Sequence, residues 1–143
     1  MAITDDGTLV VIRRERAGQP VYRVFPGGGM QASDWDEISA LQRELDEEIS
    51  GDATVCQLIY SHERTMSTGE HMRENFYLCR LHGFSLNGGS GPEWKNANPD
   101  NRYFVEVLAV DQDSLRGANL LPTEVVDLLI AAPDPFALPK IDV

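Results

Sequence analysis

Three glutamates lie within one short stretch of the chain, Arg43-Glu44-Leu45-Asp46-Glu47-Glu48. On a helical wheel that advances about 100° per residue, Glu44, Glu47 and Glu48 fill an arc of roughly 100°. This arc adjoins an apolar stripe made of Ile38, Leu41, Leu45 and Ile49. The three carboxylates are therefore predicted to lie together, at the edge of the buried face of a helix.

Such a grouping is electrostatically unfavourable unless a cation accompanies it. Like charges three or four residues apart on a helix repel each other, at roughly a few tenths of a kcal/mol per pair. Glu47 and Glu48 also lie towards the helix C-terminus, where the helix dipole disfavours anions. A hard divalent cation such as Mg²⁺ prefers oxygen ligands and would turn the cluster into a binding site. The alternative is a solvated acidic face with Arg43 as its partner.

The elements that must position these residues follow from hydrophobic patterning and turn signals. The main helix is predicted over residues 36–50 and a second one over 122–130. Strands are predicted over residues 9–14, 21–25, 54–60, 74–81 and 103–110. Residues 87–101 are rich in Gly, Asn and Pro and form a loop of a length that is often functional. This order predicts an α/β fold, with a mixed central sheet and helices packed on it.

The chain is expected to form a single domain over residues 1–143, with a proline-containing tail at 132–143. Its net charge of -11 argues against binding to nucleic acid polymers, which select basic surfaces. No stretch approaches the ~18 apolar residues of a membrane helix. The first residues lack the basic region and apolar run of a secretory signal, so a cytoplasmic location is expected. Cys56 and Cys79 are expected to be free thiols.

The region from Pro26 to about Gly51 resembles the Nudix box, whose pattern is G-x5-E-x7-R-E-U-x-E-E-x-G-U with U an aliphatic residue. The box spans about Gly28 to Gly51, and Arg43 to Glu48 match its R-E-U-x-E-E portion without change. Pro26-Gly27-Gly28 matches the turn that leads into the box. Because these matches occur together, the resemblance is specific.

Two positions depart from the pattern. Counting forward from Gly28 places the first acidic position at Asp34, whereas counting back from Arg43 places it at Trp35. The chain is one residue longer here, and Asp34 is the expected replacement for the glutamate that braces the arginine in the family. The terminal glycine position holds Ser50, with Gly51 one residue later. Neither departure changes the three glutamates.

The resemblance implies a Nudix-like α/β/α sandwich that hydrolyses a phosphoanhydride bond in a nucleoside diphosphate derivative or a related nucleotide. It implies that Glu44, Glu47 and Glu48 bind Mg²⁺, or Mn²⁺ in its place, with the carbonyl of Gly27 as a further ligand. A bound metal would polarise phosphoryl oxygens and lower the pKa of a water. Glu44 is expected to orient or deprotonate that water, and Arg43 to hold Glu44 in place.

Four further residues are candidates for the site. Many Nudix enzymes supply another acid from a loop after the box, and Glu93 is the candidate here; a surface acid is the alternative. Arg13, Arg14 and Arg23 lie in strands near the box and are candidates to contact substrate phosphates, although strand arginines commonly face solvent.

The rival function is a Nudix-fold module that holds a nucleotide without cleaving it. The intact glutamates favour the enzyme, and the altered region at Asp34 and Trp35 favours the binding module. Oligomeric state stays open, with a homodimer common among related folds.

Overall fold

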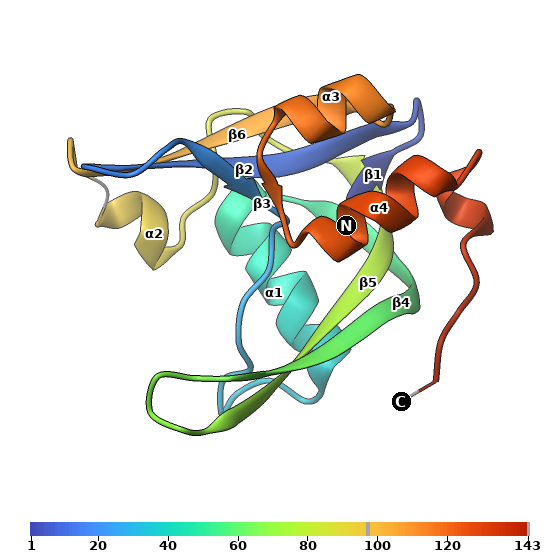
Figure 1. Ribbon diagram of the computed structural model, residues 1–143. Coiled ribbons are helices and arrows are strands. Elements are labelled where there is room, and N and C mark those ends of the chain that lie inside the picture. The colour runs from blue at the N-terminus through green and yellow to red at the C-terminus, as the bar shows by residue number, and fades with distance from the viewer. Residues whose placement is uncertain (97, 143) are drawn as a thin grey trace.

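Strand β2 (Thr8–Arg16) organises the sheet of the computed structural model (Figure 1), which describes residues 1–96 and 98–142 except the side chain of Glu93. One edge of β2 pairs with β1 (Ala2–Thr4) and then with β3 (Tyr22–Val24), and the other edge pairs with β6 (Asn101–Ala109). The described sheet continues through β5 (His71–Gly83), β4 (Asp52–Thr65) and β7 (Leu120–Leu121). β1 is parallel to β5 and β3 to β7, whereas the other pairs are antiparallel. The sheet is therefore mixed, as predicted.

Alternate residues of β2 face opposite sides of the sheet and enter two different cores. Val10 and Ile12 pack with Leu45 and Ile49 of α1 (Glu37–Ile49), on the side that also carries α2 (Pro92–Lys95). Leu9 and Val11 enter the other core, which holds residues of α3 (Gln112–Gly117) and α4 (Thr123–Ala131). Figure 1 shows α1 and α2 below β2 and β6, and α3 above them. This arrangement is the predicted α/β/α sandwich.

Helix α1 begins and ends at strong local signals. The carboxylate of Asp36 accepts a hydrogen bond from Ser39 N, and the Ser39 hydroxyl accepts one from Asp36 N, which together form a capping box. At the other end, Ser50 adopts a left-handed conformation with φ of 49°. The helix predicted over residues 36–50 is confirmed, and its N-cap is Asp36 rather than the expected Ser33 or Asp34.

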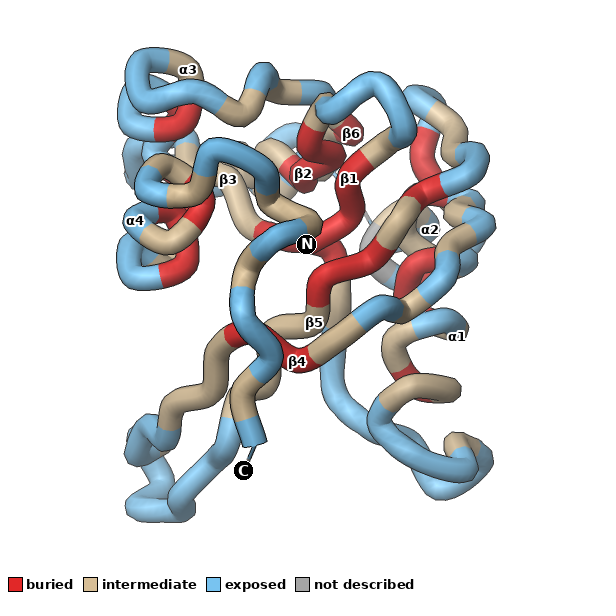
Figure 2. Tube along the Cα trace, turned by 90° about the vertical axis from the view of Figure 1, so that its right-hand side faces the viewer, coloured by how far each residue is buried: buried red, intermediate tan, exposed pale blue. Residues whose placement is uncertain are grey.

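Several short elements, among them β1, α3 and β7, were not predicted, and β4 and β5 extend well beyond their predicted bounds. β1, α3 and β7 have three, six and two residues, so none carries a hydrophobic period of its own. β4 and β5 extend past the sheet as a hairpin whose polar end is largely exposed (Figure 2). Its residues pair with each other by backbone hydrogen bonds, and such pairing leaves no apolar alternation in the sequence.

The glycine-rich segment at residues 85–91 packs against the C-terminal end of α1. Ser85 N donates to the carbonyl of Ile49 at 2.8 Å, and Gly91 N donates to the carbonyl of Glu47 at 2.9 Å. A Cβ at Gly89 would lie well inside contact distance of that Glu47 carbonyl oxygen. Only glycine permits this approach of two backbones. The predicted loop at 87–101 is thus tied to the box helix, and it contains α2.

The C-terminal tail packs along β4. After the 3-10 helix η1 (Pro135–Ala137), the chain returns along β4, where Ile141 N donates to the carbonyl of Leu58 at 2.9 Å. Among the described residues, no helix is long and apolar enough to cross a membrane.

Candidate active site

Arg43 lies at the centre of a group of carboxylates on α1 and the preceding loop. Its Nε and Nη2 donate to the two oxygens of Asp34, each at 2.9 Å. Its Nη1 donates to Glu44 Oε1 at 3.0 Å and to Glu47 Oε2 at 3.1 Å. Its Nη2 also donates to the carbonyl of Gly29 at 3.0 Å. One guanidinium therefore holds three carboxylates and the glycine loop in a fixed relation.

Asp34 fills the bracing position, and Trp35 does not. The two-point contact between Asp34 and Arg43 is the geometry that best matches a guanidinium to a carboxylate. Trp35 is 95% exposed. The shorter acid reaches Arg43 from a loop that is one residue longer than the family pattern.

The loop at residues 26–29 contacts the glutamates with its backbone. Gly27 has a φ of 153° and donates its N–H to Glu48 Oε2 at 3.0 Å. A Cβ added to Gly28 would lie 2.5 Å from Glu44 Oε1. Glycine at both positions allows the backbone to lie directly against two carboxylates, a role that the glycine run alone did not reveal.

The electrostatics of this group are dominated by the Arg43 pair. Glu44 is the one charged residue that is buried in the described part of the chain, at 6% exposed. Hydrogen bonds from Arg43 lower the pKa of Asp34, with further bonds from the Gln31 backbone and a partly opposing effect of burial. The hydrogen bond with Asp34 in turn raises the pKa of Arg43. Both partners therefore stay charged over the neutral range.

The donor set suits a divalent cation. Asp34, Glu44 and Glu47 bring three carboxylates to the guanidinium of Arg43, and Glu48 accepts a hydrogen bond from Gly27 N in the adjoining loop. All ligand atoms on offer are oxygens, which Mg²⁺ and similar hard cations prefer. Within residues 1–96 and 98–142, no three acidic, histidine or cysteine side chains already stand as a preformed metal cluster. These carboxylates lie close together and repel one another, so a bound cation would stabilise them in one arrangement.

The sheet separates the three candidate arginines. Arg13 donates to Glu106 Oε1 at 2.6 Å and Arg23 to Glu106 Oε2 at 3.1 Å, on the face of the sheet that carries α3 and α4. Arg14 lies on the other face, with α1, and donates to the Tyr103 hydroxyl at 2.7 Å. The structure thus brings Arg14 to the side of the box helix and leaves Arg13 and Arg23 on the opposite side.

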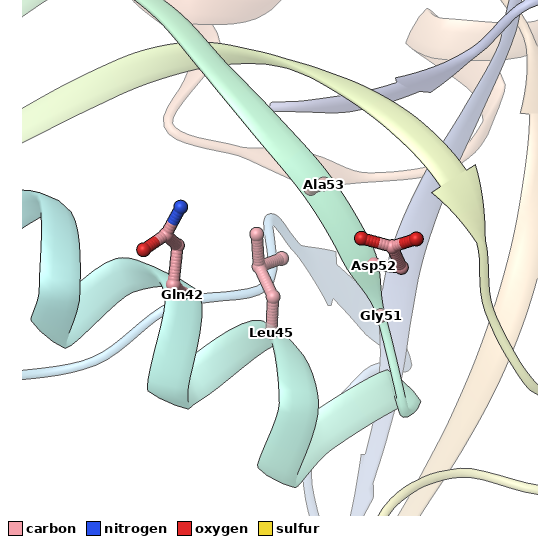
Figure 3. A pocket seen from close by; sticks show the side chains of 5 residues that line it. All are labelled: Gln42, Leu45, Gly51, Asp52 and Ala53. Atoms are coloured by element: carbon pink, nitrogen blue, oxygen red, sulfur yellow. The ribbon is translucent and has the colours of Figure 1, made fainter.

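Glu93 belongs to α2, but its side chain lies outside the described residues, so its role stays a prediction. A cavity of about 160 Å³ between α1 and β4 is lined by Gln42, Leu45, Gly51, Asp52 and Ala53 (Figure 3). None of these residues is one of the three glutamates.

The Asp34–Arg43 pair predicts a pH-dependent stability. A carboxylate whose folded pKa is lowered stabilises the fold above its unfolded pKa, and this contribution is lost as the pH falls through the folded pKa. The melting temperature of the wild type should therefore fall more steeply than that of Asp34→Asn as the pH is lowered from about 5 to below the ordinary value of 3.8.

Calorimetry at a series of pH values measures this difference. Asp52→Asn, which removes an exposed carboxylate at the start of β4, is the matched control and should follow the wild type. Parallel curves for Asp34→Asn and the wild type would contradict the prediction.

Comparison with known proteins agrees with this fold. The NUDIX domain family model matches residues 1–125. The solution structure of the E. coli ORF135 protein is similar over 90% of this chain and 81% of that one, with a TM-score of 0.58 and 22% identity. MutT, from a study of the fish pathogen Aliivibrio salmonicida and the mesophile Vibrio cholerae, is similar over 91% of each chain, with a TM-score of 0.52 and 18% identity. None of the curated proteins matches the chain.

Proposed function

Because the chain belongs to the NUDIX domain family and is a hydrolase of phosphorus-containing anhydrides, we propose that it cleaves a nucleoside diphosphate derivative or a related nucleotide with the help of Mg²⁺. The observation that carries the proposal is the position of Glu44. Its carboxylate is buried, bonded to Arg43 and pressed against the backbone of Gly28. A buried acid held in this way is suited to act on one particular water molecule.

The residues that would hold the cation are Glu44, Glu47 and Glu48, with the carbonyl of Gly27 as a further ligand. A bound Mg²⁺ supplies charge neutralisation at the phosphates and a more acidic water, and Mn²⁺ is expected to substitute for it. Glu44 orients the attacking water and accepts its proton. Arg43 fixes the directions of the Glu44 and Glu47 carboxylates through its Nη1. Glu93 remains the candidate for a second acid.

The contacts of Asp34 weaken the case for a module that binds without cleaving. The altered sequence at residues 34 and 35 is the feature that favours a binding module over an enzyme. Asp34 makes a two-point contact with Arg43, so the brace is present despite the extra residue. A homodimer and a cytoplasmic location stay predictions.

A panel of nucleotides tests the proposal. The panel contains nucleoside triphosphates, nucleoside diphosphate sugars and dinucleoside polyphosphates, each incubated with Mg²⁺, with Mn²⁺ or with EDTA. Products are separated by anion-exchange chromatography. At least one compound should yield a nucleoside monophosphate with either metal, and EDTA should abolish the product. The proposal fails if no compound is cleaved, or if cleavage continues unchanged in EDTA.

A further inference from the structure

The carboxylate of Glu37, the first residue of α1, is tied to strand β5 by hydrogen bonds from two side chains. Asn75 Nδ2 donates to Glu37 Oε1 at 3.0 Å and to Oε2 at 2.9 Å. The Tyr77 hydroxyl donates to Oε2 at 2.7 Å. Asn75 and Tyr77 are two residues apart on one strand, so both side chains project to the side of the sheet that carries α1. We call Glu37, Asn75 and Tyr77 the Glu37 clamp.

The hairpin of β4 and β5 holds Asn75 in the orientation that the clamp requires. Ser61 pairs with Asn75 across the hairpin, and its hydroxyl donates to Asn75 Oδ1 at 2.7 Å. Because β4 engages the amide oxygen, the amide nitrogen is left to donate to Glu37. At the next pair of the hairpin, His62 Nε2 lies 3.0 Å from Glu74 Oε2. Such cross-strand contacts stabilise the part of the hairpin that extends past the sheet.

The two ends of α1 are held in different ways. Leu45 and Ile49, towards its C-terminal end, are almost completely buried in the core that β2 shares. Figure 1 shows α1 extending from there, below β2 and β6, towards the β4–β5 hairpin. At its start, Ile38 borders a cavity of about 380 Å³ that also reaches Tyr77. Close packing therefore fixes the C-terminal part of the helix, whereas its first residues depend more on polar contacts.

The start of α1 is directly connected to the brace of the candidate site. Glu37 follows the N-cap residue Asp36, and Asp34 lies two residues before that cap. Asp34 accepts two hydrogen bonds from Arg43, which in turn donates to the Glu44 carboxylate. Helix ends open more easily than helix centres, and an opening at Glu37 would loosen the cap and Asp34 with it. The direction of the Glu44 carboxylate therefore depends on how firmly the first turn is held.

We propose that Asn75 and Tyr77 are positioning residues for hydrolysis, an inference that rests on the proposed function. Each acts through Glu37 on the geometry of the box carboxylates. Burial, and then the hydrogen bond to Glu37, raise the pKa of Tyr77 to about 12, so this hydroxyl stays a donor throughout the neutral range. The extended hairpin of β4 and β5 thereby supports the helix that carries the candidate metal ligands.

Glu37→Ala and Glu37→Gln together test the proposal. Both remove the same negative charge, but only glutamine keeps a side-chain oxygen that can accept from the clamp. Glu37→Ala should lower kcat about tenfold at saturating Mg²⁺ on the nucleotide that the substrate panel identifies, with KM changed by less than about twofold. Glu37→Gln should keep kcat within about twofold of the wild type, because hydrogen bonds still hold the first turn.

The Nε–H of Arg43 gives a readout that involves neither metal nor hydrolysis. It donates to Asp34 Oδ1 at 2.9 Å, so its proton–nitrogen NMR signal should exchange slowly with water in the wild type. In Glu37→Ala this exchange should be about tenfold faster, since the brace opens more often when the first turn is released. In Glu37→Gln it should match the wild type.

Glu124→Ala is the matched control. Glu124 lies in the first turn of α4, on the other side of the sheet, and is exposed. Its replacement removes a first-turn carboxylate without altering the clamp, so kcat and the Arg43 exchange should both match the wild type. Tyr77→Phe keeps the ring and removes one donor. It serves as the test if Glu37→Ala does not fold, with an expected loss of about threefold in kcat.

Wild-type exchange of the Arg43 signal in Glu37→Ala would overturn the proposal, and so would wild-type kcat. Equal losses in Glu37→Ala and Glu37→Gln would also overturn it, because they would assign the effect to charge and not to the hydrogen bonds. Failure of the proposed function is a different result, namely a wild type that cleaves no nucleotide in the panel. The exchange measurement then still decides whether the clamp holds the brace.

Discussion

Glu44→Gln should lower kcat about 1,000-fold on the nucleotide that the substrate panel identifies, within the range of effects for removal of a general base. The amide keeps the size of the side chain and still offers an oxygen to Arg43 Nη1. It cannot accept a proton from water, and it brings no negative charge to a cation. The fold should be retained, because the buried position is still filled and hydrogen-bonded. Steady-state hydrolysis measures the loss, and circular dichroism checks the fold.

Asp46→Asn is the matched control for this variant. Asp46 lies on the same helix, two residues away, and is exposed, so its neutralisation changes the helix charge equally. It should keep kcat within about twofold, as surface substitutions usually do. If Glu44→Gln retained full activity, Glu44 would not be the base. If both variants lost activity equally, the helix charge rather than one positioned carboxylate would explain the effect.

Gly28→Ala should lower kcat about 100-fold while the protein remains folded. The added Cβ would lie 2.5 Å from Glu44 Oε1 and almost as close to the other two atoms of that carboxylate. The carboxylate must turn away, because the obstructed atoms are the end of a side chain and the backbone of the loop is tied to Glu48 through Gly27. If Glu44 is the base, as proposed, its displacement by about 1 Å is enough for a loss of this size.

Gly29→Ala separates the displacement of Glu44 from a general effect on the loop. A Cβ at Gly29 would meet nothing within 4 Å, so this neighbour gains a methyl group without a clash. Its kcat should stay close to that of the wild type, measured in the same assay with the same metal. Equal losses in both variants would mean that loop flexibility matters and that the contact between Gly28 and Glu44 does not.

The sequence predicts the box helix well because independent signals coincide there. The apolar stripe, the acidic residues at its start and the Arg43–Glu48 pattern all indicate one helix in one register, and α1 confirms it. The short elements β1 and β7 depend on pairing with β5 and β3 instead. A strand of two or three residues has no period to detect, so only the folded partner defines it.

The candidate site likewise has parts that local sequence patterns predict and parts that only the fold defines. Spacing along the chain brings Glu44, Glu47 and Arg43 together and leaves Asp34 as the acid for the brace. Alternation along β2 also requires Arg13 and Arg14 to face opposite sides of the sheet. This alternation does not reveal which side of the sheet carries α1, because that depends on the path of the chain between β3 and β4. Arg14 of β2, Trp94 of α2 and Tyr103 of β6 meet only in the fold, and no local pattern connects residues so far apart.

The contact of Gly89 with the end of α1 has a consequence for redesign of the protein. Two backbones touch there, so the start of the loop cannot be moved without moving the helix that bears the glutamates. Trp94, which follows in α2, packs on the Tyr103 ring from this fixed starting point. An engineer can therefore exchange the segment that follows residue 91 as a cassette. The junction must keep glycine at 89 and an N–H at 91, so that the new loop begins where the old one did.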